Sequence, residues 1–153
     1  MIATQSSTYA NAADKFGAGN CIDGNTSSDH EPDGRYGRTY AICQTSRDAA
    51  PWIAVDYGTS VAVERVEIFN RGTSGRRTRN VEVRVSDSLP ASGSRMFSGG
   101  VLLGRFAGPA TDGQHIIISG QRLLTSGRYV IVQMDNGGDV LNLREVKAFG
   151  RLP

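Results

Sequence analysis

Four arginine side chains fall close together in the segment NRGTSGRRTRN, which runs from Asn70 to Asn80. A guanidinium group offers a rigid fork of N–H donors that suits bidentate contacts with ligand oxygens. Such a cluster is typical of a solvated hairpin tip, a polyanion-binding patch, or a small pocket that holds a ligand through these donors. The chain has a net charge of only +2, so the molecule as a whole is not built to attract nucleic acid. The arginines are Arg71, Arg76, Arg77 and Arg79.

Catalytic motifs are absent from the sequence. The two histidines, His30 and His115, do not form a metal-ligand pair such as His-x3-His. There is no Gly-x-Ser-x-Gly nucleophile motif. The segment GAGNCI lacks the last glycine of a dinucleotide-binding loop. We therefore expect a binding protein rather than an enzyme.

The cysteines and the hydropathy pattern indicate in which cellular compartment the protein would fold. The two cysteines, Cys21 and Cys43, suit either one disulfide in an oxidising compartment or two unreacted thiols in a cytosol. No run of 18 apolar residues and no signal peptide are present, so we expect no membrane insertion. We interpret the chain as a domain of a longer secreted or cell-surface protein.

Short strands dominate the apolar pattern, and helical periodicity is almost absent. In VAVERVEIF the alternation slips once between Val63 and Val66, which predicts a β-bulge. Because turn residues separate the runs, we predict one all-β domain over residues 1–153, an antiparallel β-sandwich. The predicted strands are Trp52–Tyr57, Val61–Asn70, Val81–Val85, Val101–Phe106, His115–Ile118, Tyr129–Met134 and Leu141–Phe149.

The first fifty residues differ from the rest. They are rich in Gly, Asn, Asp and Ser and poor in strand pattern. A loop region this long inside a compact domain is usually functional or held by other contacts.

Six motifs follow one another along the chain: ATQSSTY, AGNCIDGNTSS, PWIAVDYG, VERVEIFNRG, SGRYVIVQM and LNLREVKAFG. Together they resemble the discoidin-like or galactose-binding-like sandwich over almost the whole sequence. Within that superfamily the sequence is most similar to the F-type lectins. The resemblance implies a jelly-roll-like sandwich whose loops at one end bind terminal α-L-fucose on glycans, without catalysis.

F-type lectins use a histidine, then an Arg-x-Asp after about 26 residues, then a second basic residue. The matching positions here carry Gln44, Arg71, Thr73 and Arg77, with 26 residues between Gln44 and Arg71. Gln44 and Thr73 depart from the family pattern. An amide supplies an acceptor and donors, so Gln44 can partly replace the histidine. Thr73 cannot anchor Arg71 as a carboxylate would.

The loop between Asp23 and Cys43 is longer than the resemblance implies. His30 in this loop is an alternative for the missing histidine. An apolar shelf under the methyl group of fucose is expected from tyrosines, and burial of that methyl group contributes about 0.8 kcal/mol. The candidates are Tyr9, Tyr36 and Tyr40.

The resemblance also implies a structural calcium ion beneath the binding loops. Calcium binds six to eight hard oxygens, and Asn-x-x-Asp-x-Asn wraps a tight turn that Gly24 permits. The alternative is an Asx-rich turn that bonds its own backbone. With both cysteines beside these ligands, the resemblance favours a Cys21–Cys43 disulfide over two buried thiols. The implied ligands are Asn20, Asp23, Asn25, Glu145 and the carbonyl groups of Ile42 and Arg144.

Three other functions stay open. The first is a discoidin-type module that binds galactose or anionic glycans, which Arg76, Arg79 and Arg84 favour. Its affinity for an anionic glycan would fall steeply as the salt concentration rises, because salt screens the charges. Arg76 and Arg79 also compete with Arg77 for the role of second basic residue. A lipid-surface module needs apolar loop tips, whereas these are polar, and a non-binding sandwich is the third alternative. Because single-site affinity for a neutral sugar is modest, we expect an oligomer or tandem domains to supply avidity.

Overall fold

The computed structural model describes residues 1–27, 42–120, 125–135 and 137–151. Every strand pairing in these ranges is antiparallel. No helix among the described residues is long and apolar enough to cross a membrane. The strands are β1 (Ile2–Gln5), β2 (Cys43–Gln44), β3 (Trp52–Asn70), β4 (Val81–Ser86), β5 (Val101–Phe106), β6 (His115–Ser119), β7 (Thr125–Met134) and β8 (Asn142–Arg151), and the helices are η1 (Tyr9–Asn11), α1 (Ala13–Phe16), η2 (Ala18–Cys21) and η3 (Gly75–Arg77).

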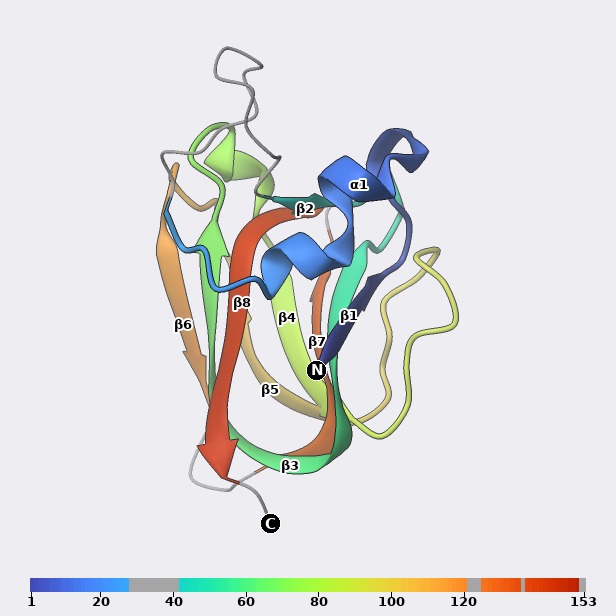
Figure 1. The fold of residues 1–153 in the computed structure, drawn as a ribbon, viewed down its shortest axis with the longest axis vertical. Coiled ribbons are helices and arrows are strands. Elements are labelled where there is room, and N and C mark those ends of the chain that lie inside the picture. Colours follow the sequence, from blue (N-terminus) through green and yellow to red (C-terminus); the bar gives the residue numbers. More distant parts are fainter. Residues whose placement is uncertain (28–41, 121–124, 136, 152–153) are drawn as a thin grey trace.

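Strand β3 joins the two layers of the sandwich. Its first part, from Trp52 to Asp56, pairs with β1 and β7, and its later part, from Arg65 to Phe69, pairs with β6 and β8. Between them Gly58 has a φ of +76°, which glycine adopts without steric cost. Figure 1 shows the bend at the lower end of the molecule, where β3 passes from one layer to the other. The predicted antiparallel sandwich is therefore confirmed.

The sequence predicted two strands, Trp52–Tyr57 and Val61–Asn70, where the structure has one. This prediction was wrong because the ladder with β7 shifts after Asp56 and then resumes, so the strand bends without ending. The predicted bulge is confirmed, since the register with β8 shifts between Val63 and Arg65.

The bend is fixed by a bidentate ion pair. Arg128 Nε and Nη2 donate to the two carboxylate oxygens of Asp56 at 2.8 and 2.7 Å. The backbone N–H of Gly58 donates to the same carboxylate at 2.7 Å. The hydrogen bonds from Arg128, and then that from Gly58, lower the pKa of Asp56 to about 2.

An apolar core lies between the layers. Val66 and Ile68 of β3 and Val83 and Val85 of β4 are buried in it. These positions alternate along their strands, as expected when one face of each strand is buried. The core extends to the disulfide between Cys21 and Cys43.

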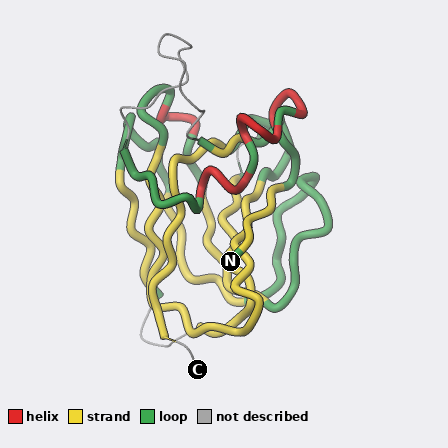
Figure 2. Tube along the Cα trace, viewed as in Figure 1, coloured by secondary structure: helices red, strands yellow, loops and turns green. Residues whose placement is uncertain are grey.

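The short helices gather at one end of the sandwich. Figure 2 shows all of them at the same end of the strands, opposite the bend in β3. The sequence analysis predicted neither these helices nor the strands β1 and β2. Each of these elements is too short to show a hydrophobic periodicity. Strand β2 has only two residues, and its pairing with β8 depends on a strand about a hundred residues away.

Candidate functional site

The loop that follows β3 is organised by the buried side chain of Asn70. Its Nδ2 donates to the carbonyl oxygens of Gly75 and Thr111 at 3.0 and 2.9 Å, and its Oδ1 accepts from Thr78 Oγ1 at 2.8 Å. A Cβ at Gly75 would collide with the Thr111 carbonyl and the Asn70 amide, so only glycine fits there. These contacts close the loop that carries the arginine cluster.

Within this loop Thr73 holds Arg71 through a hydrogen bond. Arg71 Nη2 donates to Thr73 Oγ1 at 3.2 Å. We expected Thr73 to leave Arg71 without the anchor that a carboxylate provides. The hydroxyl occupies that role in weaker form, because a neutral acceptor bonds a guanidinium less strongly than an ionised one.

The remaining arginines of the cluster differ in their surroundings. Arg77 is half-buried at the end of η3, whereas Arg76 is exposed. Arg79 Nη1 lies 3.6 Å from Asp139 Oδ2 and 3.5 Å from the Arg76 carbonyl oxygen. Arg77 and Arg79 are thus both partly enclosed on the loop that carries Arg71, and Arg79 is directed to Asp139.

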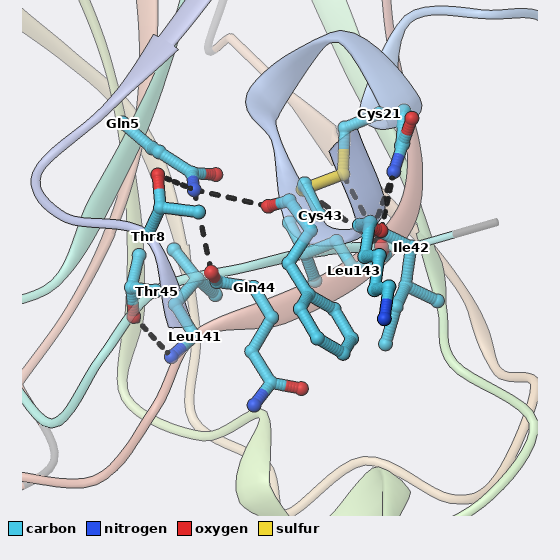
Figure 3. Close-up of a disulfide and its surroundings, with 12 residues drawn as sticks. Gln5, Thr8, Cys21, Ile42, Cys43, Gln44, Thr45, Leu141 and Leu143 are labelled. Atoms are coloured by element: carbon cyan, nitrogen blue, oxygen red, sulfur yellow. Dashed lines mark hydrogen bonds between the residues drawn. A yellow bond between two sulfur atoms is a disulfide. The ribbon is translucent and has the colours of Figure 1, made fainter. Parts of the chain in front are cut away.

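Gln44 reaches the same end of the sandwich from a different strand. Gln44 pairs with Asn142 of β8 and is 6% exposed as a residue, and in Figure 3 its side chain points away from the disulfide. Strand β8 lies between β2 and β3 in the sheet, and Asn70 of β3 pairs with Leu143. Arg71, the next residue, therefore follows β3 on the other side of Asn142. The fold thus places these two residues on either side of β8, although 26 residues separate them in the sequence.

The first loop is tied to Gln44 by the amide of Gln5. Its Nε2 donates to Thr8 Oγ1 at 2.9 Å, to the Phe16 carbonyl at 3.0 Å and to the Gln44 carbonyl at 3.3 Å. Figure 3 shows Gln5, Thr8 and Gln44 joined in this way. Tyr9, next to Thr8, is 45% exposed and packs edge-to-face on Phe16 at 5.2 Å. The sequence predicted Tyr9 as an apolar shelf but missed Phe16, which carried no pattern that separates it from core residues.

The predicted disulfide is confirmed. Cys21 at the end of η2 is bonded to Cys43 of β2, with 5.5 Å between the Cα atoms. Both residues are fully buried and their sulfur atoms lie against the Leu143 carbonyl oxygen. The bond therefore fastens the turn after η2 to the strand that carries Gln44 (Figure 3).

One residue predicted to bind calcium, Glu145, is a buried carboxyl group next to the turn that carries Asp23. Glu145 is 3% exposed, and its Oε1 accepts from the Gly24 N–H at 3.1 Å. Its Oε2 has no hydrogen-bond partner among the described residues. Burial, together with the neighbouring negative charge of Asp23, raises the pKa of Glu145 to about 7. Two close carboxyl groups, one of them buried, form a donor set that a hard cation would stabilise.

The other implied ligands lie on the same turn or beside it. Asn20 Nδ2 donates to the Ile42 carbonyl at 3.1 Å, and the side chains of Asp23 and Asn25 accept from backbone N–H groups two residues further on. Arg144 is the extra residue of a bulge, because Phe69 pairs with Glu145 and Asn70 with Leu143. Asx turns are thus present as the alternative reading expected. Among the described residues no three His, Cys, Asp or Glu side chains gather, so backbone and amide oxygens would have to complete a cation site.

Arg84, the third arginine favoured for anion binding, is engaged with an acid, and so is its neighbour Arg105. Arg84 Nε lies 3.2 Å from Glu82 Oε2 and its Nη1 donates to backbone carbonyls. Arg105 Nη2 lies 2.6 Å from the same carboxylate. On this surface two arginines share the single carboxylate of Glu82, so most of their charge is already paired. Three candidates from the sequence, His30, Tyr36 and Tyr40, lie outside the described residues.

The chain belongs to the F5/F8 type C family. The family model that matches describes a NedA-like, galactose-binding domain, and it covers residues 20–98, just over half of the sequence. Among curated proteins none matches the chain significantly. The fold is the discoidin-like sandwich of carbohydrate-binding lectins and modules.

Solved structures similar to this chain include lectins. A fucolectin from the serum of the striped bass, Morone saxatilis, is 30% identical with a TM-score of 0.80 over 97% of this chain and 46% of that one. This chain therefore spans less than half of that fucolectin. The lectin domain of lectinolysin, complexed with Lewis B antigen, is 25% identical with a TM-score of 0.69 over 97% and 92% of the two chains. A fucose binding module from Streptococcus pneumoniae shares the fold at 22% identity, with a TM-score of 0.69 over 98% and 91%.

Proposed function

We propose that this chain is a non-catalytic lectin domain that binds terminal α-L-fucose on glycans. The observation that supports the proposal is the position of Gln44 and Arg71 on either side of β8, at the end where the loops gather. These are two of the four positions that the F-type lectin motif selects. Arg77, half-buried on the same loop as Arg71, is proposed as the second basic residue.

The chemistry of these groups suits a neutral sugar. Vicinal hydroxyl groups are donors and acceptors, and two guanidinium groups supply several directed N–H donors to their oxygens. Hydrogen bonds from charged donors are the stronger kind. The Gln44 amide adds an acceptor, which arginine lacks. Tyr9 with Phe16 is proposed as the apolar shelf, because their aromatic pair lies on the loop bonded to Gln44.

We further propose a structural calcium ion held by the carboxylates of Asp23 and Glu145. Oxygens of Asn20, Asn25, Ile42 and Arg144 would complete its shell. The buried Glu145 carboxyl group and its raised pKa support a cation there. The ion would neutralise the two acids and stiffen the turn that the disulfide joins to β2.

The setting proposed for the domain is extracellular. The buried disulfide supports this, since such bonds persist mainly in oxidising compartments. Weak single-site binding would be raised by several copies of the domain acting together. Tandem domains or an oligomer are therefore proposed for the full protein.

Galactose is the second candidate ligand, because the matching family model describes a galactose-binding domain. A glycan array that carries fucosylated, galactose-terminated and sulfated or sialylated glycans separates the alternatives. We expect signal on fucosylated glycans, its loss in Arg71→Ala, and its retention in Arg105→Ala, a charge-matched control on β5. Signal confined to galactose-terminated or anionic glycans, or equal signal from both variants, would overturn the proposal.

A further inference from the structure

Asn142 is a fully buried amide at the start of β8, and its side chain has unmet hydrogen-bonding capacity. It is 0% exposed, and neither its Nδ2 nor its Oδ1 has a hydrogen-bond partner among the described residues. A buried polar group left in this state typically costs about 1–3 kcal/mol. Such a cost is usually associated with a function or with a partner that the isolated chain does not supply.

The sheet register places Asn142 directly beside Gln44. The two residues are cross-strand partners between β2 and β8, so their side chains lie on the same face. Thr45 N donates to the Leu141 carbonyl at 2.9 Å, so the adjacent pair of Gln44 and Asn142 is a non-hydrogen-bonded pair. In such pairs the side chains approach most closely, with about 4.5 Å between Cα atoms.

The flanking residues confirm which way Asn142 faces. Leu141 and Leu143 are part of the apolar core, as is Cys43, the residue before Gln44. Because side chains alternate along a strand, Asn142 and Gln44 lie on the face away from this core. Arg71 follows β3 on the other side of Asn142, so the buried amide sits between the two side chains proposed to bind the sugar.

Gln44 needs such a neighbour more than a histidine would. Its amide ends a side chain with three rotatable bonds, and its oxygen and nitrogen are of nearly the same shape but opposite hydrogen-bonding character. Although it is only 6% exposed, its side chain makes no hydrogen bond in the structure as described. Nothing there determines which end of the amide meets a ligand.

We propose that Asn142 is a positioning residue that orients the Gln44 amide when a glycan binds. In the bound state a sugar hydroxyl bonds to Gln44 and Gln44 bonds to Asn142, so one chain of hydrogen bonds satisfies both buried amides. This proposal rests on the proposed lectin function and adds to it a residue outside the family motif.

The test compares Asn142→Leu with the wild type in titrations of methyl α-L-fucoside. Loss of the hydrogen bond between Asn142 and Gln44 should weaken binding of the fucoside about tenfold, the effect of one ordinary hydrogen bond. The melting temperature should stay the same or rise, because an unsatisfied amide is replaced by an apolar group of similar size. Should Asn142→Leu not fold, Asn142→Ala provides the same comparison.

Gln133→Leu is the matched control. Gln133 is also a 0% exposed amide, but it bonds the Phe97 N–H at 2.9 Å and the Phe97 carbonyl at 2.8 Å. Its replacement should lower the melting temperature and leave the affinity of the folded protein unchanged. The opposite behaviour of the two variants separates positioning from general packing.

A double-mutant cycle tests whether Asn142 acts through Gln44. In a Gln44→Leu background, Asn142→Leu should cause no further loss of affinity, because the group that it orients is gone. Additive losses, or an Asn142→Leu affinity within about twofold of the wild type, would overturn this inference and leave the lectin function standing. A wild-type protein that binds no glycan would overturn both.

Discussion

At the candidate site, two side chains differ from the F-type lectin pattern but keep part of the hydrogen-bonding capacity of the residues they replace. Arg71 donates to the hydroxyl of Thr73 at 3.2 Å, where the F-type lectin pattern has an aspartate. A hydroxyl positions the guanidinium group but adds no charge. Gln44 stands in for a histidine in a similar way, with the right atoms but with more rotational freedom.

We expect Thr73→Asp to strengthen binding of methyl α-L-fucoside about fivefold, because a carboxylate bonds and orients Arg71 more firmly than a hydroxyl. Thr73→Val, which keeps the shape but removes the acceptor, should weaken binding. Calorimetric titration of both variants measures the difference. Equal affinities in the two variants would show that Thr73 does not position Arg71.

At the scale of elements, β3 and the loop after it set the geometry of the site. The strand needs its bend so that one end can pair within one layer and the other end can lead into the arginine loop. Asp56, Arg128 and Gly58 fix that bend. Asn70 fixes the loop at the opposite end of the strand.

The Asp56 pair should give the stability a defined pH dependence. The pKa of Asp56 falls from 3.8 to about 2 on folding, so its contribution is complete above about pH 4 and is lost as the pH falls through 2. Asp56→Asn should therefore be less stable than the wild type at pH 6, with the difference shrinking between pH 4 and pH 2. Urea denaturation at several pH values measures this. A difference that does not change with pH would exclude a role for the charge.

At the scale of the whole molecule, the disulfide and the proposed cation site act on the same region. Cys21 and Cys43 close a loop with a sequence separation of 22 residues, worth about 3 kcal/mol in the chain-entropy model. The turn of Asp23 follows Cys21 directly, and Gly24 bonds the carboxyl group of Glu145. The end of the sandwich that carries Gln44 is thus held at two points.

Saturating Ca²⁺ should raise the melting temperature of the wild-type domain by about 5–10 °C relative to chelator. Glu145→Gln should lose this response, because an amide binds a divalent cation less strongly than a carboxylate does. Glu82→Gln is the matched control, since Glu82 is a half-buried acid bound by Arg84 and Arg105 instead. Identical melting curves with Ca²⁺ and chelator would remove the calcium proposal.

The sequence predicted those parts of the fold whose signals are local. Alternation identified the long strands, and the single slip between Val63 and Val66 predicted the bulge. The bend within β3 was taken for a gap, because a glycine turn and a strand end look the same in sequence. Short elements such as β2 gave no signal, since their pairing partner lies far away in the chain.

The candidate site likewise has residues with a local sequence signal and a residue whose role depends on the folded sheet. Motif spacing selected Gln44 and Arg71, which lie on either side of β8 at one end of the fold, and their role in binding stays a prediction. Asn142 could not be selected, because an asparagine between two leucines indicates only which face it occupies. Its neighbours are set by the order β2–β8–β3, which is a property of the folded sheet.

The arginine loop is proposed to bind a neutral sugar rather than an anion. Titration of methyl α-L-fucoside at low and high ionic strength tests it most directly. We predict saturable binding that changes less than about twofold between 0.05 and 0.5 M salt, because no net ligand charge is screened. It should be abolished in Arg71→Ala. Absence of fucoside binding, or an affinity that collapses with salt, would contradict the claim.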